Sequence, residues 1–188
     1  MKKITIPKNA TKVFSGIIFD VWHWRQKMFD GSHETFEMLN RRPTVDVIAT
    51  IGDKIIVLKQ QQPRRRPYHS LPGGGIEEDE SPLTAAGREL REETGHAAKK
   101  LRLIARSEGN YKMKYVEHVF AGDECARVSP LKLDSGEKII VTFVPFETFL
   151  RYCRDEEFAI PLTLRFMMYE ALLDGRKKHA LKKLIFNG

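Results

Sequence analysis

The sequence predicts an α+β fold with mixed sheets, a central helix and further helices at the end of the chain. Strand-like segments lie on both sides of the central helical pattern, so strands and helices do not alternate regularly. Regular alternation would have predicted a parallel α/β fold instead. The 188 residues, of which 41% are hydrophobic, suit one globular domain with a sizeable core.

The start of the chain shows strand patterns. Residues 12–26 alternate as one β-strand would, and the large apolar positions that share a face are Phe14, Ile18, Trp22 and Trp24. The dipeptide Asp30-Gly31 then indicates a hairpin turn. We therefore expect an N-terminal β-strand region over residues 1–45 and the main domain, with its C-terminal helices, over residues 46–188.

The main domain opens with a second hairpin and continues through further strands and helices. The segment TVDVIATIGDKIIVLKQQ turns at Gly52-Asp53. Three more segments have strand character: LRLIARS, KYVEHVFAG and KIIVTFVPF. Two later segments are predicted to be helical: ETFLRYCRD and PLTLRFMMYEALLDG.

The central helix is bounded by recognisable end signals. Ser81 can cap its start, and Pro82 fits the first helical position, where a missing N–H costs nothing. Gly95 indicates its end, because glycine readily adopts the left-handed conformation after the last turn. The periodicity predicts a buried stripe of Leu83, Ala86 and Leu90.

Three carboxylates share another face of this helix. Glu89, Glu92 and Glu93 stand at positions i, i+3 and i+4. Like charges at this spacing disfavour a helix by about 0.2–0.5 kcal/mol, so a positive group should compensate. A hard divalent cation such as Mg²⁺ prefers carboxylate oxygens and leaves positions free for phosphates. The alternative is a solvated face on which Arg88 and Arg91 supply the positive charge.

Three glycines precede the helix and complete a motif. They allow a tight turn and close approach to a ligand, and a carbonyl freed by the turn can add an oxygen ligand. From Gly74 the spacing is five residues, Glu80, seven residues, and then RELREETG from Arg88. This pattern resembles the Nudix box, in which an aliphatic residue usually takes the place of His96. The chain is therefore similar to the Nudix hydrolase superfamily.

The resemblance implies roles for these residues. Glu89, Glu92 and Glu93 would bind divalent metal ions, Mg²⁺ or alternatively Mn²⁺, together with the backbone carbonyl of Gly73. Glu93 would be the strongest ligand, whereas Glu92 would act partly through the others and is also a candidate catalytic residue. Glu80 and Arg88 resemble the ion pair that braces the family's loop against its helix.

Segments outside the box resemble the branch that contains ADP-ribose and nucleoside diphosphate sugar pyrophosphatases. These segments are KVFSGIIFDVWHWRQKMFDGSHETFEML, QQQPRRRPYHSLPGG and EKIIVTFVPFETFL. The branch implies an α/β/α sandwich with a mixed sheet and a homodimer with exchanged N-terminal strands. It also implies metal-dependent hydrolysis of a nucleoside diphosphate linked to a sugar, giving a nucleoside monophosphate and a sugar phosphate.

Candidate substrate contacts come from the loop before the box and from aromatic residues. Arg64, Arg65 and Arg66 fit phosphate contacts because guanidinium groups match phosphate oxygens, although a solvated loop explains them equally well. Trp22 and Tyr68 are candidates for stacking on a base, with core or dimer packing as the alternative for the tryptophan.

In this branch the catalytic base lies on the loop before the last core strand. That loop reads LKLDSGEK, and it offers Glu137 as the base with Asp134 in reserve. Gly136 would let the loop close on bound substrate. An ordinary solvated turn is the alternative.

Composition limits the partners and the compartment. The net charge is +7, and the tail after Asp174 supplies five positive charges and no acid, which suits a solvated helix end better than a nucleic-acid site. No apolar run could span a bilayer, and the start lacks an apolar signal segment. Two cysteines without metal-ligand spacing favour the reducing cytoplasm.

Two alternatives to a nucleotide-sugar hydrolase stay open. One is a Nudix hydrolase of another nucleotide, such as a nucleoside triphosphate, a dinucleoside polyphosphate or an RNA 5′ end. The other is a non-catalytic nucleotide-binding regulator, against which the complete set of acidic residues argues. Many ADP-ribose enzymes carry a proline shortly after the box, and SEGNYKMKYVEH has none, so the linked group also stays open.

Overall fold

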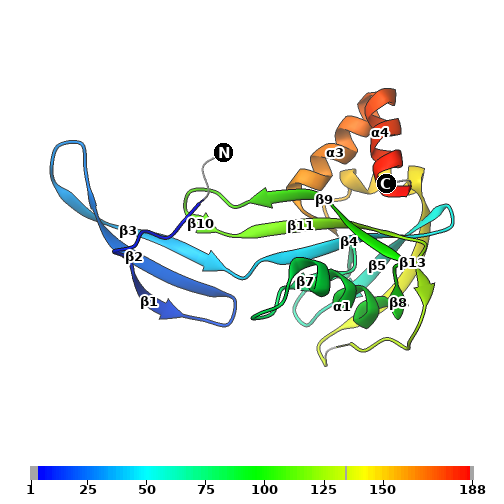
Figure 1. Cartoon of the computed structure of the whole chain (residues 1–188), viewed down its shortest axis with the longest axis horizontal. Coiled ribbons are helices and arrows are strands. Elements are labelled where there is room, and N and C mark those ends of the chain that lie inside the picture. Colours follow the sequence, from blue (N-terminus) through cyan, green and yellow to red (C-terminus); the bar gives the residue numbers. More distant parts are fainter. Residues whose placement is uncertain (1–3, 134, 187–188) are drawn as a thin grey trace. The chain divides into compact units, whose positions relative to one another are not determined.

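The computed structural model describes residues 4–133 and 135–186, and the chain divides into two compact units (Figure 1). The first unit extends to Pro43 and also includes Ser107–Glu117. The second holds Thr44–Arg106 and the chain from His118 onward. The N-terminal unit therefore takes in a segment from the middle of the chain. No helix among the described residues is long and apolar enough to cross a membrane.

The first unit is a four-stranded sheet in the order β1-β2-β3-β10. Its strands are β1 (Thr11–Ser15), β2 (Phe19–Lys27), β3 (His33–Arg41) and β10 (Met113–Lys114). The β2–β3 hairpin turns at Asp30-Gly31, as predicted, with Gly31 at a φ of +88°. The Asp30 carboxylate stabilises this turn by accepting a 2.9 Å bond from the backbone N–H of Ser32.

The prediction of one strand over residues 12–26 is wrong. The chain reverses between β1 and β2, and the Gly16 N–H donates to the Phe19 carbonyl at 2.9 Å to close the turn. The alternation is interrupted here by the consecutive apolar residues Ile17, Ile18 and Phe19, and the dipeptide Ser15-Gly16 is a turn signal that the prediction passed over. The face proposed for Phe14 and Trp22 is thus divided between two antiparallel strands.

The second unit is built on an eight-stranded mixed sheet. Its strands are β4 (Thr44–Ile51), β5 (Lys54–Gln61), β6 (Tyr68–Ser70), β7 (Gly73–Gly75), β9 (Lys100–Glu108), β11 (Val116–Asp123), β13 (Lys138–Pro145) and β14 (Phe158–Ala159). The β4–β5 hairpin turns at Gly52, as predicted. β13 pairs antiparallel with β5 along its whole length, whereas β14 pairs parallel with β6. A separate two-stranded ribbon joins β8 (His96–Ala97) and β12 (Ala126–Arg127).

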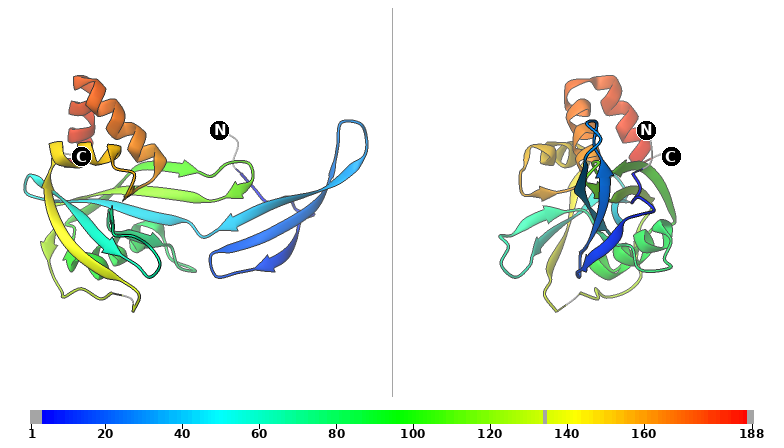
Figure 2. Two further views of the ribbon diagram at one scale, coloured as in Figure 1. Left: turned by 180° about the vertical axis from the view of Figure 1, so that it is seen from behind. Right: turned by 90° about the vertical axis from the view of Figure 1, so that its left-hand side faces the viewer.

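Helices cover both faces of this sheet (Figures 1 and 2). They are α1 (Pro82–Thr94), α2 (Phe146–Arg151), a 3₁₀ turn (Tyr152–Arg154), α3 (Leu162–Leu173) and α4 (Gly175–Phe186). Alternate residues of β4 divide between two cores: Val47 packs with α1, and Ile48 packs with the C-terminal helices. The predicted α+β class and α/β/α sandwich are confirmed.

Helix α1 begins and ends where the sequence predicts. The Ser81 hydroxyl accepts a 3.1 Å bond from the Thr84 N–H, and Gly95 closes the helix at a φ of +72°. Leu90 is fully buried, but the prediction that Leu83 is buried is wrong, because its side chain is 52% exposed. Ala85 is buried instead, so the apolar stripe is narrower and leaves the other face of α1 to the charged residues.

Candidate active site

An acidic cavity of about 460 Å³ lies between α1, β7 and the loop before β13 in the second unit. We call it the acidic pocket, and its lining consists of Gly73, Gly74, Gly75, Glu77, Arg88, Glu89, Glu92, Glu93, Lys132, Leu133 and Glu137. The four proposed metal-binding residues and the proposed base thus line one cavity, although they come from three separate elements.

The glycines of β7 let the backbone approach the helix closely. β7 pairs antiparallel with the start of β4, which fixes its position. A Cβ atom on Gly74 would lie 2.4 Å from Glu89 Oε1, and one on Gly73 would lie 2.2 Å from the Val45 carbonyl oxygen. The Val45 oxygen belongs to the backbone, so Gly73 needs to be glycine, whereas a side chain at Gly74 would require the Glu89 side chain to move.

Arg88 forms hydrogen bonds and ion pairs with several groups at the outer side of the acidic pocket. Its Nε and Nη2 atoms donate to Glu80 at 3.0 and 3.1 Å, which confirms the predicted ion pair. The same side chain reaches the Gly75 carbonyl at 2.9 Å, Glu89 at 2.8 Å and Glu92 at 3.1 Å. The bonds from Arg88 lower the pKa of the Glu80 carboxyl below its ordinary value. In return, the glutamates raise the pKa of Arg88.

Glu93 occupies a different environment at the inner end of the pocket. Only 6% of the residue is exposed, and its carboxylate accepts a 2.8 Å bond from the Gly73 N–H. Burial raises the pKa of Glu93 to about 8, and the negative charge of Glu89 adds to that effect. Burial also raises the pKa of Glu89, despite its bond to Arg88. Both inner carboxyls therefore ionise less readily than an exposed glutamate.

These carboxyls fit a hard divalent cation. A cation would favour the ionised forms that burial disfavours, and it would bind the carboxylate oxygens that Mg²⁺ prefers. Among the described residues, no group of three or more His, Cys, Asp and Glu side chains already has a metal-binding arrangement. One reason is that Arg88 bonds both Glu89 and Glu92, so metal binding would require those carboxylates to exchange partners.

The loop that carries Glu137 is tied to the C-terminal end of α1. The Gly95 carbonyl accepts bonds from the N–H groups of Val128 and Ser129 at 2.8 and 3.1 Å, and the Glu92 carbonyl accepts one from Lys132 at 2.8 Å. A Cβ atom on Gly95 would lie 2.3 Å from the Ser129 carbonyl oxygen, so glycine is needed here too. Loop closure at Gly136 stays a prediction, and Asp134 lies outside the described residues.

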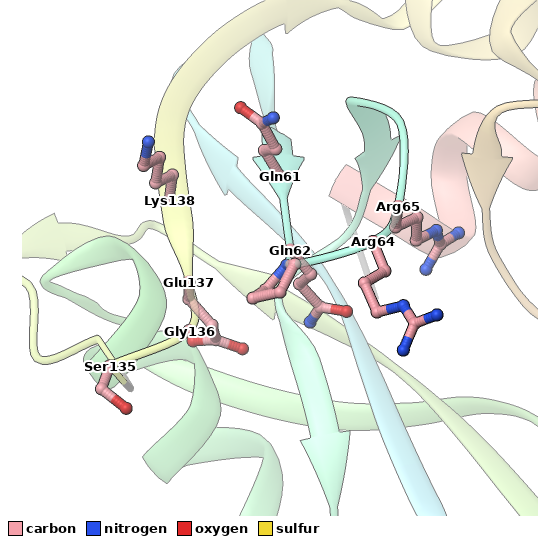
Figure 3. Close-up of a pocket in the computed structure, with 9 residues that line it drawn as sticks. Gln61, Gln62, Arg64, Arg65, Ser135, Gly136, Glu137 and Lys138 are labelled. Atoms are coloured by element: carbon pink, nitrogen blue, oxygen red, sulfur yellow. The ribbon is translucent and has the colours of Figure 1, made fainter.

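A second cavity, of about 290 Å³, adjoins the acidic pocket and shares Glu137 with it (Figure 3). We call it the arginine pocket, and its lining consists of Gln61, Gln62, Pro63, Arg64, Arg65, Ser135, Gly136, Glu137 and Lys138. Figure 3 shows the side chains of Glu137 and Gln62 pointing toward each other, with Arg64 beyond Gln62. Arg66 is exposed and lines neither pocket.

The two candidate stacking residues lie in different units. Tyr68 is only 5% exposed, and the Arg65 guanidinium carbon lies 3.4 Å from its ring centroid. Burial raises the pKa of the Tyr68 hydroxyl. One face of this ring is therefore covered by a cation, and the stacking of Tyr68 on a base stays a prediction. Trp22 belongs to β2 in the first unit, where the Lys12 ammonium lies 5.6 Å from its ring centroid, and its role in binding a base stays a prediction.

Sequence reasoning did not single out several lining residues. They are Gln61, Gln62, Glu77, Lys132, Leu133 and Lys138. Lys132 and Lys138 lie on either side of Glu137 in the chain, so their proximity to the proposed base was a usable signal. Glu77 had no such signal, because it is one of several acids in an exposed turn.

Comparisons with known proteins agree with this geometry. A family model described as the NUDIX domain matches residues 40–165. The chain is 30% identical over 161 residues to a protein of Bacillus subtilis (strain 168) named ADP-ribose pyrophosphatase, which covers 84% of this chain and 86% of that protein. It is 47% identical to an RNA pyrophosphohydrolase of Bartonella tribocorum over only 51 residues, 27% of this chain and 30% of that protein.

A solved structure also shares the fold. The crystal structure of an ADP compounds hydrolase superposes with a TM-score of 0.72 and covers 94% of this chain and 97% of that one. The sequence identity of the pair is 18%, so this likeness concerns the fold alone.

Proposed function

The chain belongs to the NUDIX family, and we propose that it hydrolyses the pyrophosphate bond of a nucleoside diphosphate linked to a sugar, such as ADP-ribose. The products would be a nucleoside monophosphate and a sugar phosphate. The observation that carries this proposal is the acidic pocket, in which buried Glu93 and half-buried Glu89 lie beside the glycines of β7 and Glu137. The named activity of the Bacillus subtilis relative supports the substrate class.

We propose that Glu89, Glu92, Glu93 and the Gly73 carbonyl hold the divalent cation, Mg²⁺ or alternatively Mn²⁺. When bound, such a cation neutralises phosphate charge and lowers the pKa of a coordinated water. The adjacent Arg88 lowers the pKa of the Glu80 carboxyl and bonds Glu89 and Glu92, and Lys132 adds a positive charge to the pocket lining. Both residues would also balance the charge of a bound pyrophosphate.

Glu137 is the proposed general base. Its carboxylate lines both pockets, so it would accept a proton from a water that attacks phosphorus between them. Arg64 and Arg65 would bind phosphate oxygens on the far side of Glu137, since guanidinium forks fit such oxygens. Asp134 is the second candidate for the general base.

We also propose that residues 1–45 form part of a homodimer through strand exchange. β1 is the edge strand of the first unit's sheet, and Phe14 and Ile17 are 59% and 98% exposed within this chain. In addition, the Trp22 indole N–H is buried without a hydrogen-bond partner among the described residues. A partner chain would cover such an edge. Light scattering at micromolar concentration should give twice the mass of 21.7 kDa, and a monomer would contradict this model.

Free, buried thiols support a cytoplasmic location for the protein. Neither Cys125 nor Cys153 forms a disulfide, and burial raises the pKa of both thiols, which keeps them unreactive. Fractionation of the native cells would test the location directly.

A second candidate substrate is the 5′ end of RNA. The local match to an RNA pyrophosphohydrolase and the five cations of the tail favour it, but that match extends over less than a third of either chain. An enzyme acting on RNA would bind oligonucleotides with an affinity that falls steeply as salt rises. ADP-ribose hydrolysis should show much weaker salt dependence.

A substrate screen tests the proposed function. Nucleotide sugars, nucleoside triphosphates, dinucleoside polyphosphates and a 5′-triphosphorylated oligonucleotide would be incubated with Mg²⁺, and the products identified by mass spectrometry. We expect a nucleoside monophosphate and a sugar phosphate from a nucleotide sugar. Turnover of the oligonucleotide alone would favour the RNA candidate, and no turnover of any pyrophosphate would favour a binding regulator.

A further inference from the structure

We propose that Tyr68 is a positioning residue that holds the Arg65 guanidinium in the arginine pocket, ready to bind a phosphate group of the substrate. This inference rests on the proposed function, because it concerns the substrate of the same site. It gives Tyr68 a role that differs from stacking on a base. It also gives a role to two buried polar residues, Gln60 and Ser70, that the proposed chemistry does not use.

The contact between the two residues is direct. The guanidinium carbon of Arg65 lies 3.4 Å from the centroid of the Tyr68 ring, which is van der Waals contact. The arginine is exposed, whereas the tyrosine is buried on β6. The aromatic ring therefore acts as a fixed floor beneath a side chain that would otherwise sample many rotamers in solvent.

The ring itself is held by a chain of buried hydrogen bonds. The Tyr68 hydroxyl donates to the Gln60 side-chain oxygen at 2.9 Å, and the Gln60 amide donates to the Ser70 hydroxyl at 2.7 Å. Gln60 and Ser70 are both buried, and Gln60 is paired directly opposite Tyr68 in the β5–β6 ladder. Buried polar groups of this kind are rigid when every member has a partner.

The backbone beneath Arg65 is also constrained. The Arg65 N–H donates to the Gln62 carbonyl at 3.2 Å, and Arg64 has a φ of +64°, an unusual value for a residue with a side chain. Such strained residues persist where the surrounding structure determines the conformation, and they concentrate at ligand-binding sites. A turn of fixed shape and a fixed ring therefore define where the guanidinium lies.

A guanidinium that stacks on a ring can still donate hydrogen bonds. Its N–H groups point outward in the plane of the group, so stacking on one face does not block them. They can therefore donate to two phosphate oxygens. Positioning the arginine before the substrate arrives reduces the entropy lost on binding. Because the arginine pocket shares Glu137 with the acidic pocket, a phosphate bound by Arg65 would lie beside the proposed base.

Equilibrium binding of ADP, measured calorimetrically with Mg²⁺ present, tests this proposal together with kcat and KM for ADP-ribose. Arg65→Gln should weaken ADP binding about tenfold to hundredfold, because it removes a charged hydrogen bond. Tyr68→Leu, which keeps Arg65 but removes the ring, should weaken it about threefold to thirtyfold. Tyr68→Phe retains the ring and should restore most of that loss. Arg65→Gln and Tyr68→Leu should raise KM far more than they lower kcat, whereas Tyr68→Phe should stay close to the wild type in both.

A double substitution separates positioning from a general structural role. In the Arg65→Gln background, Tyr68→Leu should cause no further loss of ADP affinity, since there is no guanidinium left to hold. An equal loss in both backgrounds would overturn the proposal, as would a Tyr68→Leu enzyme that loses kcat with its KM unchanged. Arg176→Gln is the matched control, because this exposed arginine on α4 lines neither pocket, and it should leave affinity unchanged.

The outcomes distinguish this proposal from the proposed function. A wild-type protein that binds ADP but hydrolyses no nucleotide sugar would reject the function, and the ADP affinities of the variants would still decide the role of Tyr68. A wild-type protein that does not bind ADP would overturn the positioning role. Should Tyr68→Leu not fold by circular dichroism, Tyr68→Met in both backgrounds provides the same comparison, because it also removes the ring.

Discussion

Glu80 and Glu93 belong to one motif, yet their carboxyls lie in opposite electrostatic environments. Glu80 accepts two bonds from Arg88 near the surface of the loop, and this pairing lowers its pKa. Glu93 is buried at the other end of the pocket and accepts one bond from the Gly73 backbone, so burial dominates and raises its pKa to about 8. The protein supplies a positive side chain for Glu80, namely Arg88, but only a backbone N–H for Glu93.

This difference distinguishes Glu80, which has a structural role, from Glu93 and Glu89, which are proposed to bind a cation. The Glu80–Arg88 pair closes the loop onto the helix and is complete in the protein alone. Burial opposes the ionisation of Glu93 and Glu89, so without a cation a negative charge on either carboxyl is a cost to the folded state. Substitutions at the two ends should therefore change different properties: activity at Glu93 and stability at Arg88.

The largest expected effect is the loss of activity in Glu93→Gln. The change preserves size but removes the buried charge that the metal needs, and such electrostatic stabilisation amounts to several kcal/mol in the transition state, about 10³-fold in rate or more. The metal-free variant should be as stable as the wild type or more stable. Steady-state kinetics and denaturant unfolding measure the two properties, and wild-type turnover in the variant would refute the assignment.

Glu137→Gln should lower kcat by about 10²–10⁴-fold while nearly preserving substrate affinity, as expected for loss of a general base. Asp134→Asn should do much less, and it serves as the matched control from the same loop. An active Glu137→Gln enzyme beside an inactive Asp134→Asn enzyme would transfer the role to Asp134. Two active variants would return the base to the helix, with Glu92 as the candidate.

Arg88→Leu should reduce the free energy of unfolding by about 2 kcal/mol. The Arg88 and Glu80 side chains are 24% and 10% exposed, so the expected cost lies between those of surface and buried ion pairs. Glu93→Gln is the comparison within the same pocket. Chemical denaturation at pH 7 measures both, and a larger destabilisation in Glu93→Gln than in Arg88→Leu would reverse the roles proposed for the two ends.

Measured per pH unit, the smallest expected effect is a pH dependence of stability in the metal-free protein. Between the ordinary pKa of 4.5 and about 8, folded Glu93 holds more protons than the unfolded chain. Its contribution to stability is therefore present at low pH and is lost as pH rises through about 8, by at most about 1.4 kcal/mol per pH unit. Glu80 acts in the opposite sense, because its lowered pKa stabilises the fold above 4.5 and that stability is lost on acidification.

Thermal melts of metal-free wild type and Glu93→Gln across this range measure the difference between them. The wild-type Tm should fall relative to that of the variant between pH 5 and pH 8. Parallel curves would mean that Glu93 is ionised without a cation.

Local chemical signals made parts of the fold predictable from sequence. Ser81, Pro82 and Gly95 mark the ends of α1 because capping is a property of a few adjacent residues. The resemblance to the family motif predicted the Glu80–Arg88 pair, and helical spacing predicted that the acids share one face of α1. By contrast, the β1–β2 reversal at Gly16 was missed, because the alternation on either side of it outweighed the Ser15-Gly16 turn signal.

Long-range packing explains the remaining differences. Leu83 fits the helical stripe but is exposed, because the sheet beneath α1 contacts Ala85 and Leu90 instead. Tyr68 is an aromatic residue of the kind that can stack on a base. Its position on β6 buries it beneath the Arg65 guanidinium. Such outcomes depend on which elements are neighbours in three dimensions, and one sequence carries no direct record of that.

The most direct test of the buried, cation-seeking Glu93 is proton release on metal binding. Titration calorimetry with Mg²⁺ or Mn²⁺ at pH 7, repeated in buffers of different ionisation enthalpy, counts the protons released per ion bound. With a pKa of about 8, Glu93 is mostly protonated before the metal arrives, so the wild type should release close to one proton from it. Glu93→Gln should bind weakly and release far fewer. Tight binding without proton release, or equal binding in both proteins, would contradict the central claim that burial keeps this carboxyl protonated until a cation binds.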